Sequence, residues 1–341
     1  MTPAETATET PAEPTAKPNA ESPTESATET EDEPVFNFPR LSTVPCSACT
    51  FSPERQRCCS YDSHVKIFYE AGDRATWALG SDWILKDLGP RHANAEALNA
   101  CFVKENTTIP VPTIIADHKD SGHTLTLMTR IPGEPLNVAW PKLTDSEKEK
   151  IAEQTAEYLL QLRALQSDCI KGVGDHPTYS HWLYEEDGQA NAPCPFFTSD
   201  EETWNGLARR LNPAVPEKAR RRLRSYMPPV EPFTFTHNDL THVNIMVKDG
   251  ELTGIIDWEG AGYYPVWWQY TSNIITLEGE DDAQWKRLLR KYMPKIDGAY
   301  WFWVYYYFLC RKDLESGPAK KFLDQCDESE DSEGEATERE D

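Results

Sequence analysis

Two polar segments contain the residue types that phosphoryl transfer requires. Residues 235–247 read FTHNDLTHVNIMV, and residues 254–259 read GIIDWE. Phosphoryl transfer from ATP needs a carboxylate that accepts the proton of the acceptor hydroxyl, and magnesium held by hard oxygen ligands. Asp239 in a loop, Asn244 five positions later and Asp257 at the end of a following strand would supply these groups. A lone Asp or Asn usually forms a turn, but these three fit one motif together.

The remaining requirement is a cation that holds the phosphates for in-line attack. Lys86 lies in the run WILKDL at 83–88, which is predicted to form a β-hairpin with ATWAL at 75–79. A solvated lysine on a strand is the alternative interpretation. The glycine-rich pattern GxGxxG does not precede this strand, and only Gly72 and Gly80 are available. The loop that would cover the phosphates is therefore weakly defined.

The pattern His-x-Asp-x-x-x-x-Asn in the first segment resembles the catalytic loop of the protein-kinase-like superfamily. The form HNDL, followed by NIMV and IIDWE, is similar to aminoglycoside phosphotransferases and choline kinases. Fungal phosphotransferase-family proteins of unknown substrate resemble the chain in four further runs, which are IPVP at 109–112, IPGE at 131–134, AWP at 139–141 and WEGAGYYP at 258–265. The resemblance covers roughly residues 75–323.

The resemblance implies an α+β fold of the bilobal protein-kinase-like type. A small N-terminal lobe would hold a β-sheet with one helix, a larger C-terminal lobe would be mainly helical, and ATP and Mg²⁺ would bind between them. By position, Asp239 aligns with the general base and His237 with the histidine that supports the catalytic loop. Asn244 and Asp257 align with the magnesium ligands. Thr241 stands where many such relatives have His or Ser.

The same resemblance implies the nucleotide contacts. Lys86 aligns with the phosphate-binding lysine, and Glu96 on the following helix aligns with the glutamate that pairs with it. An ordinary exposed helix residue is the alternative for Glu96. The hinge that contacts adenine through backbone groups and apolar walls would consist of Met128, Thr129, Arg130 and Ile131. His242 and Glu259 could contact substrate or belong to the plain surface.

Hydrophobic patterning places these residues on predicted elements. Residues 93–104 favour a helix with an apolar face at Leu98, Cys101 and Phe102, which the following prolines end. Two strands are predicted at 114–115 and 125–128, joined by a turn at 118–122.

Most of the remainder to residue 323 is predicted to be helical. Thr144 with Glu147 forms a capping-box pattern that starts a helix running to about Gln166. Short β-like runs occupy 233–258, where Asp249-Gly250 is a hairpin turn signal. The apolar run 299–310 is too short to span a membrane and is interpreted as a buried core helix.

Composition predicts the domain boundaries. Residues 1–34 contain mainly Thr, Glu, Pro, Ala and Ser, so they cannot bury enough apolar surface to offset the entropy of ordering. We expect a disordered acidic tail at 1–34, an N-terminal lobe with a leading segment at 35–128, and a hinge at 129–135. A helical lobe with the catalytic loop is expected at 136–323, and a second disordered acidic tail at 324–341.

The charge distribution argues against nucleic acid as a partner. The formal net charge is -23, but most of it lies in the two tails, and phosphate backbones are bound by clustered Lys and Arg. A basic run, either a phosphate patch or a solvated helix face, consists of Arg209, Arg210, Lys218, Arg220, Arg221, Arg222 and Arg224. With neither an apolar signal core nor a membrane span, we expect a cytoplasmic protein without a membrane partner.

Two further features leave alternatives open. Cys46, Cys49, Cys58 and Cys59 could hold a metal ion, but adjacent cysteines close a tetrahedral site poorly and free thiols are favoured. Trp267 and Trp268, like the aromatic run 300–308, suit a helical core better than a wall for a cationic substrate.

The sequence therefore predicts an ATP-dependent phosphotransferase acting on a hydroxyl of a small molecule. A protein kinase is disfavoured because Asp257 begins Asp-Trp-Glu rather than Asp-Phe-Gly, and no Ala-Pro-Glu follows. A catalytically silent nucleotide-binding or scaffold protein is disfavoured because Lys86, Asp239, Asn244 and Asp257 are all retained.

Overall fold

The computed structural model describes residues 65–89, 95–180, 182–183, 193–272 and 279–337, with side chains to residue 327. The chain divides into two units, Met1–Arg40 and Leu41–Asp341, and all described residues belong to the second. The predicted N-terminal tail and the four-cysteine cluster lie outside the described residues. Among those residues, none of the helices combines the length and the apolarity that spanning a bilayer requires.

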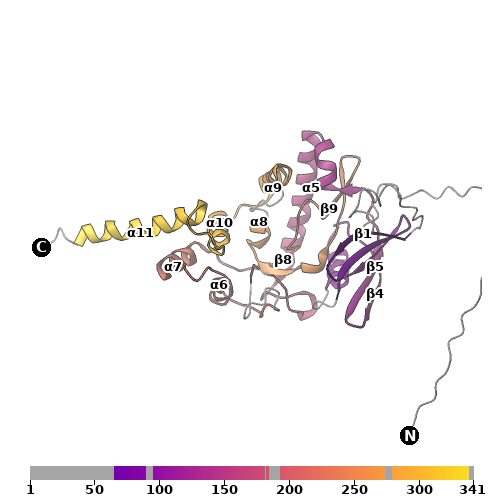
Figure 1. The fold of residues 1–341 in the computed structure, drawn as a ribbon. Coiled ribbons are helices and arrows are strands. Elements are labelled where there is room, and N and C mark those ends of the chain that lie inside the picture. The colour runs from indigo at the N-terminus through magenta and orange to yellow at the C-terminus, as the bar shows by residue number, and fades with distance from the viewer. Residues whose placement is uncertain (1–64, 90–94, 181, 184–192, 273–278, 338–341) are drawn as a thin grey trace, which may run out of the picture. The chain divides into compact units, whose positions relative to one another are not determined.

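The N-terminal part is a five-stranded antiparallel sheet in the order β1-β2-β3-β5-β4, drawn in indigo and purple in Figure 1. Its strands are β1 (Val65–Ala71), β2 (Arg74–Leu79), β3 (Trp83–Asp87), β4 (Ile114–Asp120) and β5 (His123–Thr129). The predicted hairpin is confirmed as β2 and β3, and it places Lys86 opposite Thr76. The predicted turn at 118–122 is too long, because the strands continue to Asp120 and His123 around Ser121-Gly122.

Helix α3 (Glu96–Asn106) buries a different face from the predicted one. Leu98 is 38% exposed and Cys101 is exposed, whereas Glu96 and Asn99 are buried. The predicted apolar face was wrong for Leu98 and Cys101 but right for Phe102, whose ring packs against Phe235 and Tyr263. Glu96 and Asn99 turn inward because they have polar partners inside the protein. The Asn99 amide donates to the carbonyl oxygens of Trp258 (2.8 Å) and Ala261 (3.0 Å).

The C-terminal part is mainly helical. Its long helices are α5 (Asp145–Ala164), α6 (Asp200–Ala208), α7 (Glu217–Tyr226), α9 (Glu280–Tyr292), α10 (Ala299–Leu309) and α11 (Gly317–Thr337). Short helices are α4 (Leu136–Ala139), η1 (Trp140–Lys142), η2 (Val173–Asp175), η3 (Trp258–Gly260) and α8 (Trp268–Ser272). The predicted capping box is confirmed, since the Thr144 side chain accepts from the Glu147 amide and Glu147 bonds back. Helices α5 and α9 pack together, as Figure 1 shows.

Two small sheets frame the polar segments. One has the order β10-β9-β6 and the other β11-β8-β7. The strands are β6 (Glu134–Pro135), β7 (Gln166–Ser167), β8 (Phe233–Thr236), β9 (Ile245–Lys248), β10 (Glu251–Ile255) and β11 (Gly262–Pro265). Asp249 and Gly250 join β9 to β10 with φ values of 52° and 76°, as the hairpin signal predicts.

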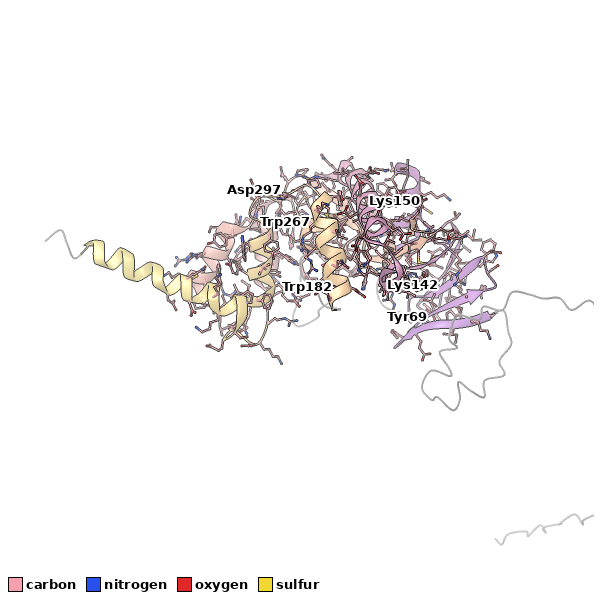
Figure 2. All side chains as sticks on the ribbon, turned by 90° about the horizontal axis from the view of Figure 1, so that it is seen from above. Tyr69, Lys142, Lys150, Trp182, Trp267 and Asp297 are labelled. Carbon is pink, nitrogen blue, oxygen red and sulfur yellow. The ribbon has the colours of Figure 1, made fainter. Side chains whose placement is uncertain are left out.

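An aromatic core fills the space between α6, α7, α8, α10 and α11. Trp267 and Trp268 are buried there, and so is most of α10, which confirms the predicted core helix. The ring of Trp303 lies 6.3 Å from that of Trp182 and 6.5 Å from that of Trp267. Figure 2 labels Trp182 and Trp267. Burial of such rings supplies much of the apolar contact in a domain core.

The basic run has structural contacts on this core. The Arg220 guanidinium donates to the carbonyl oxygens of Ala208, Asn212 and Val215. Arg222 and Arg224 lie over the rings of Phe322 and Trp204. These arginines are therefore engaged with neighbouring elements of the helical lobe, a structural role that differs from both the phosphate patch and the solvated helix face.

Helix α11 extends beyond the point where the sequence predicts disorder at 324. Its first turns bury Ala319, Phe322 and Cys326 against α7 and α10. Once this face has nucleated the helix, each added residue gains a backbone hydrogen bond at little further cost. The helix therefore continues to Thr337, as the yellow ribbon in Figure 1 shows.

The buried amide of Asn99 generates a stability prediction. We expect Asn99→Ala to lower the free energy of unfolding by about 1–3 kcal/mol. The carbonyl oxygens of Trp258 and Ala261 both lose the side-chain donor of Asn99, although that of Trp258 keeps the Ala261 amide. Chemical denaturation measures the change. Leu98→Ala on the exposed side of the same helix is the control and should cost no more than about 0.5 kcal/mol. Equal losses in the two variants would contradict the packing described for α3.

Candidate active site

The loop between β8 and β9 is closed by hydrogen bonds around Asp239. The Asn244 Nδ2 donates to the Asp239 carbonyl oxygen (2.8 Å) and to its Oδ2 (3.2 Å). The Thr241 amide donates to the Asp239 carbonyl oxygen (3.0 Å) and the Asn244 amide to that of Thr241 (3.1 Å). Asn238 has a φ of 71°, a left-handed conformation that asparagine tolerates better than most residues.

The fully buried His237 side chain links this loop to the segment before Asp257. Its Nδ1 accepts the Asp239 amide (3.3 Å), so Nε2 carries the proton and donates to the Ile256 carbonyl oxygen (2.9 Å). Burial lowers the pKa of His237, although the Asp239 carboxylate acts in the opposite direction. The imidazole is therefore neutral at pH 7, in the one tautomer that satisfies both neighbours.

Asp257 follows β10 with a φ of 68°. A residue other than glycine in this region costs roughly 1–3 kcal/mol and persists where the surroundings impose it. The Ile256 amide donates to the Asn244 carbonyl oxygen (3.0 Å), which holds the end of β10 against the loop of Asp239. Burial alone would raise the pKa of Asp257, but the ammonium of Lys86 lowers it below its usual value.

Lys86 connects three elements through one ammonium group. Its Nζ donates to both oxygens of Glu96 on α3 (2.8 and 2.7 Å) and to Asp257 Oδ1 (2.8 Å). The lysine side chain is only 15% exposed and that of Glu96 only 2%. Burial would lower the pKa of Lys86, but the carboxylates of Glu96 and Asp257 raise it above its ordinary value. The lysine is therefore a permanent cation between the two lobes.

The backbone of the predicted hinge is hydrogen-bonded to the residues that precede β4 and β3. The Thr129 amide donates to the Thr113 carbonyl oxygen (2.9 Å) and the Arg130 amide to that of Asp82 (2.7 Å). The Ile131 amide has no hydrogen-bond partner among the described residues. Met128 is buried, and a side chain at Gly254 would come within 2.8 Å of Ile131. One free donor beside an apolar wall is what recognition of a flat heterocycle requires.

The oxygen atoms near Lys86 fit a divalent cation such as Mg²⁺. Magnesium binds through carboxylate and amide oxygens. Asn244 uses its Nδ2 for Asp239, which leaves its Oδ1 for other interactions, and Asp257 Oδ2 has no partner among the described residues. Single oxygens of Glu96, Asp257 and Glu259 also lie within 4.8 Å of one another.

Sequence reasoning missed one contact between the lobes. Arg74, the first residue of β2, donates from its guanidinium to Glu259 Oε2. Glu259 lies two residues after Asp257, and the sequence left it open between substrate contact and surface. No local signal in the sequence marks Arg74, because its partner lies 185 positions away.

The fold and the site define a protein of the kinase-like class, in which an antiparallel sheet with one helix faces a helical lobe across a lysine–carboxylate cluster. The model of the phosphotransferase enzyme family matches residues 71–293. The chain belongs to this family.

Several solved aminoglycoside phosphotransferases are structurally similar to the chain. The streptomycin–ATP complex of APH(2")-IIa is 16% identical over 77% of this chain and 90% of that chain, with a TM-score of 0.48. APH(4)-Ia is 15% identical over 78% and 92%, with a TM-score of 0.48. ADP-bound APH(2'')-Ib is 13% identical over 80% and 94%, with a TM-score of 0.46. A comparison with curated proteins finds no match.

Neutral, buried His237 predicts a specific pH dependence of stability. A histidine whose folded-state pKa lies below its unfolded value stabilises the fold above that unfolded value, about pH 6.5. That contribution is lost as the pH falls, by up to about 1.4 kcal/mol per pH unit. We expect His237→Gln to have a lower free energy of unfolding at pH 8 and a shallower decline towards pH 5.

Denaturant titrations from pH 5 to 8 measure both slopes. His118→Gln, which removes an exposed imidazole on β4, is the control and should decline like the wild type. A His237→Gln slope identical to that of the wild type would refute the neutral state of His237.

Proposed function

We propose that the chain transfers the γ-phosphoryl group of ATP to a hydroxyl group of a small molecule. The observation that carries this proposal is the spatial convergence of Lys86 with Asp239, Asn244 and Asp257, although Lys86 lies 171 positions before Asp257 in the sequence. The loop of Asp239 and the end of β10 are joined by the bond from Ile256 to Asn244, and Lys86 reaches Asp257 from the other lobe. Family membership supports the phosphotransferase chemistry.

Asp239 is the proposed general base. Its Oδ2 accepts from Asn244, while its Oδ1 has no partner among the described residues and can accept a proton. As the acceptor oxygen bonds to the γ-phosphorus, its proton passes to Asp239. The bond from phosphorus to the β,γ-bridging oxygen breaks at the same time, and ADP leaves with that oxygen.

Lys86 and the hinge would hold the nucleotide in line with the base. The ammonium of Lys86, oriented by Glu96, is a fixed cation for phosphate oxygens. The Ile131 amide and the Thr129 carbonyl oxygen would pair with the adenine edge, beside the Met128 side chain. Asn244 Oδ1 and the Asp257 carboxylate would hold Mg²⁺, which supplies positive charge to the phosphate oxygens when bound.

A small molecule is the proposed acceptor because protein-kinase segments are missing. The residues after Asp257 read Trp-Glu-Gly and form the short helix η3 followed by β11, rather than a long activation segment. Loss of Lys86, Asp239, Asn244 or Asp257 would have favoured a silent scaffold, but the sequence retains all four residues.

Replacement of the base tests the proposal. Asp239→Asn keeps the size of the side chain and removes its basicity, so we expect the turnover number to fall by about 10²–10⁴. ATP affinity should change little, because Asp239 is not among the proposed nucleotide contacts. ADP release is measured over amino alcohols, aminoglycosides, sugars and peptides as acceptors, and ATP binding is measured by calorimetry.

Asp249→Asn is the matched control, since this aspartate is exposed in the β9–β10 turn. It should retain wild-type turnover. If ATP·Mg²⁺ binds but no hydroxyl acceptor is phosphorylated, the silent scaffold is the correct description. Full activity in Asp239→Asn would exclude Asp239 as the base.

A further inference from the structure

The β1–β2 turn, which would cover the phosphates, is only two residues long. Kinase-like enzymes commonly place a glycine-rich loop there, whose amides approach the phosphates. In this chain β1 ends at Ala71 and β2 begins at Arg74, so that only Gly72 and Asp73 form the turn. The antiparallel pair Ala71–Arg74 closes it. The turn therefore offers only the amides of Gly72 and Asp73, and side chains beside it are the other source of donors.

Arg74 is the cation at this position. Its guanidinium reaches across to Glu259, which lies next to the carboxylates of Asp257 and Glu96. The arginine side chain is 32% exposed, so solvent and ligands can reach it. Its Nε is buried and has no hydrogen-bond partner among the described residues. A guanidinium has five N–H donors, and this arrangement uses only part of that capacity.

The charges around Arg74 favour an anionic ligand once a divalent cation is bound, because three carboxylates otherwise outnumber the two cations Lys86 and Arg74. Lys86 is already shared between Glu96 and Asp257, both of which hold it at 2.8 Å or less. If Asp257 turns to a divalent cation, two acids remain in the cluster, Glu96 paired with Lys86 and Glu259 paired with Arg74. Guanidinium binds phosphate oxygens through the same paired donors with which it binds a carboxylate.

We propose that Arg74 is a phosphate-binding residue of the ATP site, positioned by Glu259, and that it replaces the backbone amides of a glycine-rich loop. This proposal rests on the proposed function, since it requires that ATP binds between the lobes. In the absence of nucleotide, Glu259 holds the guanidinium beside the cluster of Lys86, Glu96 and Asp257. On binding, the unused donors of Arg74 meet the phosphate chain, and Glu259 keeps the side chain in place.

The competing role for Arg74 is a simple latch between the lobes. A latch depends equally on Arg74 and on Glu259, and its loss affects every nucleotide derivative in the same way. A phosphate-binding residue acts only on ligands that carry phosphates. Arg74→Met and Glu259→Gln, compared with ATP, ADP and adenosine as probes, therefore separate the two roles.

Calorimetric titration of the full chain with ATP·Mg²⁺, ADP·Mg²⁺ and adenosine provides the test. We expect Arg74→Met to weaken ATP at least about tenfold, as loss of a charge-assisted hydrogen bond implies. Adenosine affinity should stay within about twofold. Arg74→Lys should recover part of the ATP affinity, and Glu259→Gln should weaken ATP less than Arg74→Met does. Circular dichroism establishes that each variant is folded.

Arg287→Met is the matched control, because Arg287 forms an exposed pair with Glu280 on α9. It should bind all three probes like the wild type. Wild-type ATP affinity in Arg74→Met overturns the role of Arg74 and leaves the proposed function intact. Equal losses of ATP and adenosine in Arg74→Met and Glu259→Gln show a latch instead. Absence of ATP binding to the wild type refutes the proposed function itself.

Discussion

A buried ammonium group between two carboxylates is the interaction on which the rest of the site depends. Transfer of a charge from water into a protein is costly unless partners with good geometry surround it. Lys86 has such partners only when β3, α3 and the end of β10 are all in place, since Glu96 and Asp257 come from different elements. The same contact thus secures the position of α3 and orients the carboxylate proposed to bind magnesium.

The requirement that Lys86 be paired determines which face of helix α3 is buried. Local periodicity suggested an apolar stripe at Leu98 and Cys101, yet the helix turns Glu96 and Asn99 inward. Asn99 contacts carbonyl groups about 160 positions further along the chain, on either side of the turn after Asp257. The loop after β10 is therefore bound in two ways. Asp257 pairs directly with Lys86, and the Asn99 amide on α3 donates to the carbonyl oxygens of Trp258 and Ala261.

Features with local causes could be predicted from the sequence. The capping box of Thr144, the Asp249-Gly250 turn and the strand of Lys86 each depend on neighbours within a few residues. The spacing of Asp239 and Asn244 is readable for the same reason, because the two residues bond within one loop. The inward face of α3 and the contact of Arg74 with Glu259 were not predictable, because their partners are remote and tertiary structure alone brings them together.

The aromatic residues after Asp257 are better explained as a support for the catalytic loop than as a wall for a cationic substrate. Trp268 is 2% exposed and stacks on Tyr264 at 5.5 Å, so a ligand cannot reach its face. Its Nε1 instead donates to Asn238 Oδ1 (2.8 Å), and the next residue, Gln269, accepts the amide of His237. The left-handed backbone at Asn238 is thereby held by α8. This support matters because the position of Asp239 depends on the left-handed conformation of Asn238. That conformation costs free energy and persists only where the surrounding structure imposes it.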